Sequence, residues 1–127
     1  MRRSVSLALL IVVLVAGHSS KAIAAGPAAR LGDPTNHGGM ITTGTPTVLI
    51  SGQPAARLTD FVVCPQISNV SGVPVPHVGG TISSGLPTVL VGGLPAATVG
   101  DLVIESGAQS SISSGAPTVV IGTSGAN

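Results

Sequence analysis

Hydrophobic residues in this chain gather in short β-branched runs that glycine and proline separate. Two of these runs, residues 46–50 and 87–91, begin at the proline of a Gly-x-Pro sequence. Each is followed by a pair of small residues, Ser51-Gly52 or Gly92-Gly93. Such runs predict strands that start at the proline, where a missing N–H group costs least. The small pairs fit two-residue hairpin turns with positive φ, so a second strand is expected after each of them.

One longer apolar run lies near the N-terminus, at residues 5–16, directly after Arg2 and Arg3. It is shorter than the roughly 20 residues that a membrane-spanning helix needs. The sequence Ala22-Ile23-Ala24 that follows has the small-x-small form of a signal-peptide cleavage site. Residues 1–24 are therefore predicted to be a secretory leader, and residues 25–127 to be the folded domain.

Internal repetition is the strongest pattern in the chain. Residues 41–60 and residues 82–101 align without a gap. A third copy is split, since residues 112–122 supply its first half and residues 26–33 supply its second half. The pattern predicts an all-β monomer with few helices, in which three β-hairpins are related by a pseudo-threefold axis. The third hairpin is expected to close by pairing of the N- and C-terminal segments.

The copies are unevenly spaced, because residues 61–78 form an insertion between the two full copies. Each copy ends in an aspartate, and four residues after these aspartates stand His37, Cys64 and Glu105. All three are possible metal ligands, and a pseudo-threefold body would place them at similar heights around its axis. His77, which lies in the insertion, is a fourth candidate.

Composition strengthens the case for a metal. Only 7% of the residues are charged and 1% are aromatic, whereas a typical domain is about 25% charged. The core must be aliphatic and thin, and Cys64 is the only cysteine, so no internal disulfide can stabilise it. Zinc prefers imidazole and thiolate ligands, and a closed tetrahedral site would fix loops with little core beneath them. We therefore predict that His37, Cys64 and His77 bind zinc, with Glu105 as the candidate fourth ligand.

Three alternatives stay open from the residues alone. The cysteine and the two histidines could be a small buried thiol and turn residues without a metal. Glu105 could be solvated, which would leave a water as the fourth ligand, or could be the general base of a catalytic zinc. A Ser/His/Asp set can be drawn from Ser83 or Ser84, His77 and Asp101, but the serines recur in the third copy and no nucleophile elbow is present. The chain is not expected to be an enzyme.

The charge of the chain and the turn preferences of its residues indicate the roles of the repeated aspartates and arginines. Without the leader, the chain has two arginines against three aspartates and one glutamate, so its net charge is negative. The basic surface of a nucleic-acid-binding protein is therefore absent. The repeated aspartates, Asp33, Asp60 and Asp101, are expected to form Asx-turns with the backbone two residues on. Arg30 and Arg57 share one repeat position, where they either cover apolar surface or contact a neighbouring chain.

The repeat resembles a known family. The sequence Pro-Ala-Ala-Arg at residues 27–30 and 54–57, with its variant Pro-Ala-Ala-Thr at residues 95–98, resembles the motif that names the PAAR-repeat proteins. The resemblance extends over residues 26–122, because the motif occurs together with Gly-x-Pro-Thr-Val, Asp-x-x-x-His and Asp-x-x-x-Cys-Pro elements. It implies a small cone of short strands with a pseudo-threefold base and a zinc ion near its point.

The resemblance also implies a ligand set. His37, Cys64 and His77 match the ligand pattern of the family. Glu105 stands where another histidine or cysteine would be expected, so the fourth ligand is the position at which this chain departs from the family.

A function follows from the resemblance as an expectation. Family members sit on the trimeric valine-glycine-repeat (VgrG) spike of the type VI secretion system, or on related phage-type spikes, and sharpen it for puncture of a target membrane. The chain is thus expected to be a structural, zinc-stabilised tip, with one monomer capping the trimer. Such a tip is assembled in the cytoplasm and secreted with the apparatus, and an effector would travel on the spike or on an adaptor. The leader favours an alternative, an exported periplasmic metal-binding β-repeat protein that is not associated with a spike.

Overall fold

The computed structural model describes residues 26–122, and all regular secondary structure in that range is strand. The predicted leader, residues 1–24, lies outside the described residues. Between residues 26 and 122, no helix is long and apolar enough to cross a membrane. The strands are β1 (Gly26–Pro27), β2 (Met40–Ile41), β3 (Thr45–Ile50), β4 (Gln53–Ala55), β5 (Phe61–Val70), β6 (Val73–Ile82), β7 (Leu86–Val91), β8 (Leu94–Ala96), β9 (Leu102–Glu105), β10 (Ala108–Ser111) and β11 (Val120–Ile121).

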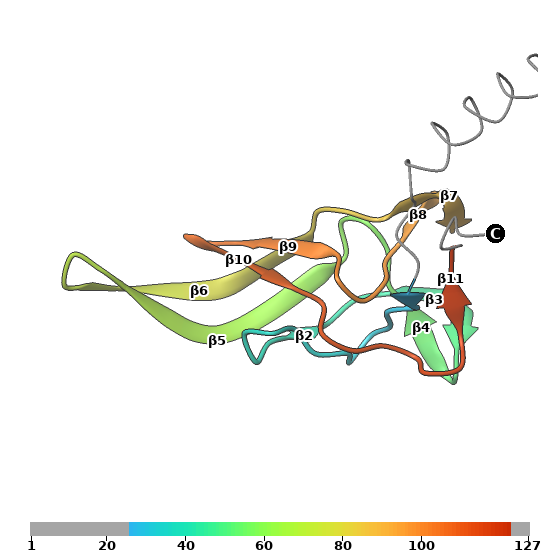
Figure 1. The fold of residues 1–127 in the computed structure, drawn as a ribbon, viewed down its shortest axis with the longest axis horizontal. Helices are drawn as coiled ribbons and strands as arrows, with labels where there is room; N and C mark the ends of the chain where they lie inside the picture. Colours follow the sequence, from blue (N-terminus) through green and yellow to red (C-terminus); the bar gives the residue numbers. More distant parts are fainter. Residues whose placement is uncertain (1–25, 123–127) are drawn as a thin grey trace, which may run out of the picture.

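Two of the predicted hairpins are formed by β3 with β4 and by β7 with β8 (Figure 1). The φ values are 50° and 84° in the turn Ser51-Gly52, and 57° and 88° in the turn Gly92-Gly93. These are the positive values that a two-residue hairpin turn requires. The first strand of each hairpin begins one residue before the predicted proline, at Thr45 or Leu86, because this buried residue already pairs with an alanine of the returning strand.

The two ends of the described chain form the third hairpin. β1 pairs with β11, with Gly26 opposite Ile121 and Pro27 opposite Val120. The other two hairpins have the same register next to their turns. The prediction that the N- and C-terminal segments pair is confirmed. Where the other two hairpins have a turn, the third hairpin has the two ends of the described chain instead.

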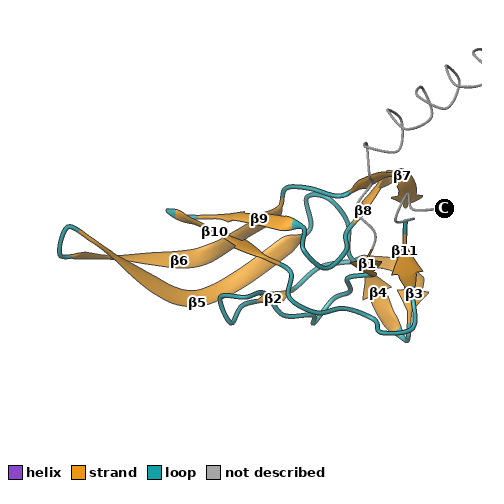
Figure 2. Cartoon of the chain, in the orientation of Figure 1, coloured by secondary structure: helices purple, strands orange, loops and turns teal. Residues whose placement is uncertain are grey.

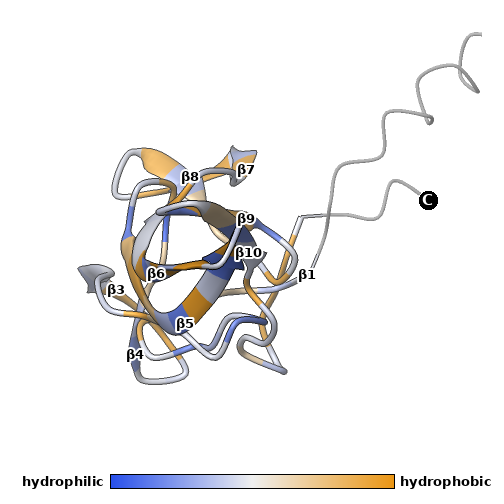
Figure 3. Ribbon diagram, turned by 90° about the vertical axis from the view of Figure 1, so that its left-hand side faces the viewer, coloured by the Kyte–Doolittle hydropathy of each residue, from blue (hydrophilic) through white to orange (hydrophobic). Residues whose placement is uncertain are grey.

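The remaining strands form a five-stranded sheet with the order β10-β9-β6-β5-β2 (Figure 2). Isolated bridges from Pro34 to Met40 and from Thr35 to Ile112 link its two edges. Viewed along the long axis, the hairpins β3–β4 and β7–β8 and the strand β1 lie at three places around the sheet (Figure 3). The arrangement is all-β and consistent with a small β-cone, as predicted.

The core is built in layers to which each repeat contributes one equivalent residue. Aliphatic and other small side chains fill every layer, and the single phenylalanine, Phe61, is exposed. A second cluster of alanines, valines and isoleucines fills the space beneath the three hairpins. The three successive layers along the axis, all nearly inaccessible to solvent, are Ala29, Ala56 and Ala97; Ile41, Ile82 and Ile112; and Thr35, Val62 and Val103.

β5 and β6 continue beyond the sheet as a two-stranded ribbon, residues 67–76, which projects away from the three hairpins (Figure 1). Most of the predicted insertion, residues 61–78, lies in these two strands. The ribbon contains no charged residue, and Ile67, Val70 and Val73 are exposed on it. The end of the molecule opposite the hairpins is therefore uncharged and partly apolar.

Two prolines block one edge of this ribbon. Pairs in a hairpin alternate between those that exchange hydrogen bonds and those whose N–H groups point outward, beginning with a hydrogen-bonded pair at the two-residue turn. Pro74 lies opposite Asn69 and Pro76 opposite Ile67, which are the outward-pointing pairs. Because proline has no N–H group, this edge offers no outward donor over residues 73–76 to which another strand could pair.

Candidate metal centre

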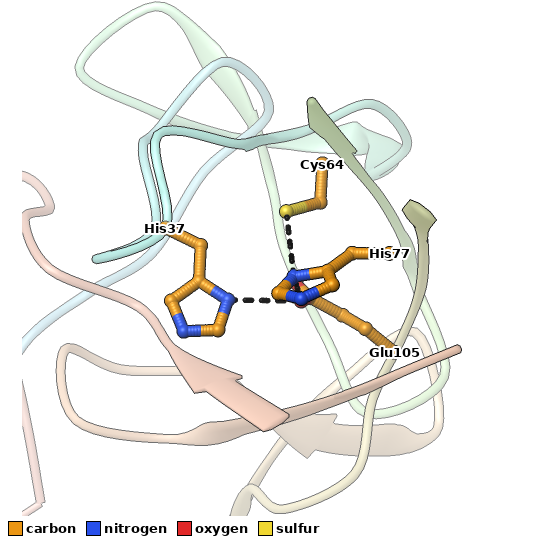
Figure 4. A group of neighbouring side chains, drawn as sticks. All are labelled: His37, Cys64, His77 and Glu105. Atoms are coloured by element: carbon orange, nitrogen blue, oxygen red, sulfur yellow. Dashed lines mark hydrogen bonds and ion pairs between the residues drawn. The ribbon is translucent and has the colours of Figure 1, made fainter. Parts of the chain in front are cut away.

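Four side chains meet where the ribbon leaves the sheet. Cys64 lies on β5, His77 on β6 and Glu105 at the end of β9, whereas His37 lies in the turn before β2. One ligand atom from each residue lies within 4.8 Å of the other three. Figure 4 shows the four side chains converging from these separate elements. The structure thus brings together all four residues that were predicted to bind a metal.

The repeat explains why these side chains point at one another. Alternate residues of a strand face the same side, so the residue two positions after a core residue also faces the axis. Cys64 and Glu105 each follow by two positions, on the same strand, a buried residue of the outermost core layer, and His37 holds the equivalent position in a turn. His77 breaks the threefold pattern, because it lies on β6 within the insertion between the two full copies.

The repeated aspartates hold the turns from which these segments start. The carboxylates of Asp33, Asp60 and Asp101 accept the backbone N–H of the residue three positions earlier, at 2.7 to 2.8 Å. Each aspartate also donates its own N–H to the carbonyl of that same residue. The predicted Asx-turn with the backbone two residues on is therefore wrong, because the chain reverses before the aspartate and continues extended after it.

Both arginines fold back onto these turns. Arg30 Nη2 lies 2.9 Å from Asp33 Oδ1, and Arg57 Nε lies 3.5 Å from Asp60 Oδ2. The hydrogen bond to Asp33 raises the pKa of Arg30 above its ordinary value. The structure therefore gives each arginine a partner within its own repeat.

The distances in the cluster suit a tetrahedral ion. With bonds of about 2.0–2.1 Å to nitrogen or oxygen and about 2.3 Å to sulfur, tetrahedral zinc separates its ligand atoms by roughly 3.3 Å for N···O and roughly 3.6 Å for N···S. Glu105 Oε1 lies 3.1 Å from His37 Nδ1 and 3.3 Å from His77 Nδ1. Cys64 Sγ lies 3.6 Å from His77 Nδ1. The donor set of two imidazoles, a thiol and a carboxylate therefore fits a metal ion.

Burial and hydrogen bonds together set the charge of the two acidic candidate ligands. Burial raises the pKa of the Cys64 thiol, and the nearby carboxylate of Glu105 raises it further despite a hydrogen bond from the backbone of Gln66. Burial is also the largest influence on Glu105 and raises its pKa, but hydrogen bonds from Ser110, His37 and Cys64 together outweigh it and leave the pKa lowered. Without a metal, the site thus favours a neutral thiol beside an ionised carboxylate.

Two glycines let the strands around the site approach closely. A Cβ atom on Gly39 would collide with the carbonyl oxygen of Val63, and one on Gly80 would collide with the carbonyl oxygen of Ile104. These glycines occupy equivalent positions, two residues before Ile41 and Ile82. They allow the segments that carry His37 and His77 to pack directly against the neighbouring strands.

Sequence reasoning missed two serines that contact the predicted ligands. Ser68 Oγ lies 2.6 Å from His77 Nε2, and Ser110 Oγ donates a 2.6 Å hydrogen bond to Glu105 Oε2. Ser110 occupies the repeat position that is glycine in the other two copies, and that difference was available in the sequence. No comparable signal points to Ser68.

The fold and this cluster define a small β-protein with approximate threefold symmetry and a site that could hold a metal ion. The sequence pattern of the PAAR motif family matches residues 31–74 and again residues 71–126. The chain belongs to this family. Its members are structural proteins rather than enzymes, and membership suggests a type VI spike-tip protein. A comparison with the curated proteins finds no match.

Proposed function

We propose that this protein is the zinc-stabilised tip of a trimeric VgrG-type spike. One observation carries the proposal. Leu49, Leu90 and Val120 occupy equivalent positions in the three hairpins, and their exposed fractions are 60%, 61% and 62%. A single chain therefore presents an exposed aliphatic side chain three times around one axis, and a trimer offers three equivalent surfaces for it.

The surroundings of these three residues support the same conclusion. In each repeat the exposed residue follows an exposed Pro-Thr pair, at residues 46–47, 87–88 and 117–118, and no charge interrupts the series. Repeated apolar and threonine side chains without charge are suited to a covered surface rather than a solvated one. The face formed by the three hairpins, the docking face, is the end that would sit on the spike.

The metal would act as a structural staple. His37, Cys64, His77 and Glu105 would hold it, and these residues come from four separate segments of the chain. A zinc ion supplies bonds that resist opening of these segments, in a body that has no disulfide and no aromatic core. Four protein ligands leave no open coordination position, which favours a structural role over a catalytic one.

In this proposal the ribbon is the leading end of the tip during secretion, and the docking face is the trailing end that is bound to the spike. The tip is loaded onto the spike in the cytoplasm and leaves with the apparatus, and an effector travels on the spike or on an adaptor. The uncharged ribbon and the metal centre behind it then meet the target membrane briefly during puncture.

The proposal is tested by association with the spike trimer of the same organism. Aspartate at Leu49, Leu90 or Val120 should each weaken binding by more than about tenfold, because a charge is then placed in an apolar contact. Ile67→Asp is a matched control, since Ile67 is also 61% exposed but lies on the ribbon. No association of the wild-type chain, or equal loss with the Ile67 variant, would overturn the docking assignment.

A second function is favoured by the leader-like sequence at residues 1–24. In that case the protein is exported and binds metal in the periplasm without a spike. Mass spectrometry of the native N-terminus separates the two proposals, because a chain that begins at Ala25 or Gly26 has been processed for export.

A further inference from the structure

Two of the candidate ligands have a second polar atom that faces away from the cluster, and a serine contacts each of these atoms. His77 directs Nδ1 toward Cys64 and Glu105, while its Nε2 lies 2.6 Å from Ser68 Oγ. Glu105 directs Oε1 toward the two histidines, while its Oε2 accepts the hydrogen bond from Ser110. Each serine thus contacts the outward-facing polar atom of one candidate ligand.

The contact with Ser68 holds Nε2 of His77 outside the cluster and suits the tautomer that binds a metal through Nδ1. A neutral imidazole has one N–H and one lone pair, and only the nitrogen with the lone pair can bind a metal. If Nε2 carries the hydrogen and donates it to Ser68, the lone pair is on Nδ1 and points into the cluster. The opposite tautomer would place a hydrogen where the metal must bind.

The contact with Ser110 fixes the orientation of the carboxylate. The Glu105 side chain is fully buried and Ser110 is 3% exposed, so in the folded chain the hydroxyl of Ser110, not bulk solvent, contacts Oε2. With Oε2 held by Ser110, Oε1 is the oxygen that faces the two histidines. A carboxylate held in this way can occupy one corner of a tetrahedron, as an imidazole or a thiolate would.

The repeat shows that Ser110 and Glu105 belong together. The positions equivalent to Ser110 are Gly39 and Gly80, where any Cβ would collide with a backbone carbonyl. Of the three segments that connect a repeated aspartate to the next repeated isoleucine, only the one between Asp101 and Ile112 accommodates a side chain there, and it is also the segment whose candidate ligand is a carboxylate. The two departures from the repeat therefore form one unit, in which the serine orients the glutamate.

We propose that Ser68 and Ser110 are positioning residues of the metal centre. Ser68 sets the nitrogen of His77 that faces the metal, and Ser110 sets the oxygen of Glu105. Because Ser68 lies on the ribbon, metal binding also fixes the ribbon relative to the sheet. The inference rests on the metal-binding part of the proposed function and does not depend on docking to a spike.

The test compares zinc affinity in Ser68→Ala and Ser110→Ala, measured by competition with a chromophoric chelator. Each variant should lose about 10- to 100-fold in affinity, the range typical of partners outside the ligand set. Ser83→Ala is the matched control, because it removes a hydrogen bond from Ser83 to the Leu102 carbonyl that involves none of the four candidate ligands. Ser68→Thr keeps the hydroxyl and should restore most of the affinity.

Two further measurements separate positioning from a general loss of stability. The absorption bands of the Co2+-substituted protein should change in Ser68→Ala and Ser110→Ala but not in Ser83→Ala. Zinc should slow amide hydrogen exchange in residues 67–76 of the wild type, and do so less in Ser68→Ala. Wild-type zinc affinity and unchanged cobalt bands in both alanine variants would overturn the positioning roles alone, whereas a wild-type chain that binds no zinc would overturn the metal centre itself.

Discussion

The backbone N–H of Ala29 donates a 2.9 Å hydrogen bond to the carbonyl oxygen of Ala97, and so joins two different copies of the repeat across the molecular axis. Ala56 donates in the same way to Ala29, and Ala97 to Ala56, so the three bonds form a closed triangle. All three side chains are almost inaccessible to solvent. The second alanine of the repeated motif is small because three backbones meet at its position.

Enlarging any of these alanines should destabilise the fold. Ala29→Val, Ala56→Val and Ala97→Val should each lower the free energy of unfolding by about 1–3 kcal/mol, because added methyl groups have no space at the triangle. Denaturant unfolding in the presence of a chelator would measure the loss. Ala108→Val, at a half-buried strand position, should change stability much less. Equal stability of all four variants would show that the axis is not closely packed.

Metal loading should depend on Cys64. We expect about one zinc per chain, the content of a single structural site. Cys64→Ala should lose most of this zinc and unfold at a lower temperature, since one ligand and its crosslink are gone. A chelator should lower the melting temperature of the wild type but leave that of the variant unchanged. A variant with full zinc content and unchanged thermal stability would refute the assignment of Cys64.

The metal-free protein should lose stability at alkaline pH. Burial raises the pKa of the Cys64 thiol in the folded chain, so above about pH 8.5 the unfolded chain releases a proton that the folded chain keeps. Stability is then fully present below the unfolded pKa and falls as the pH rises toward the folded pKa, by at most about 1.4 kcal/mol per pH unit.

Chemical denaturation between pH 7 and pH 10 would measure this slope. Metal-free Cys64→Ser should lack the part of the slope that comes from the thiol. The same slope in both proteins would contradict the raised pKa.

The hydrogen bonds of the Asp60 carboxylate should contribute more to the free energy of unfolding than its ion pair with Arg57. Asp60 is buried and accepts hydrogen bonds from the Arg57 backbone and from the Thr43 hydroxyl. Asp60→Ala should cost about 1–3 kcal/mol, because it leaves buried donors without partners. Arg57→Ala, which keeps the backbone donor and removes only the side chain, should cost at most about 1 kcal/mol. Urea unfolding of the two variants gives the comparison, and a larger loss for the arginine variant would reverse the interpretation.

The repeat made most of the fold predictable from sequence. The closing pair β1 and β11 followed from the split copy, and the hairpin turns followed from Ser51-Gly52 and Gly92-Gly93. The same alignment placed His37, Cys64 and Glu105 at one level. These features repeat, and repetition in sequence fixes equivalence in space.

Features that occur only once were harder to predict. The length of the ribbon depends on pairing within residues 61–78, which have no counterpart in the other copies. The contact of Ser68 with His77 depends on how two ribbon strands twist across one another, and no spacing rule encodes it. The aspartates were predicted to serve turns, but the direction of their hydrogen bonds depends on which side of the residue the chain reverses.

The pairing of Gly26 with Ile121 has a consequence for biosynthesis. The first described strand cannot find its partner until residues 120–121 have left the ribosome, so the third hairpin forms after the other two. Closing so large a loop slows folding compared with a chain of purely local contacts. During translation the nascent polypeptide therefore remains incompletely folded. A chaperone or translocation factor that recognises unfolded chains can bind it before β11 emerges.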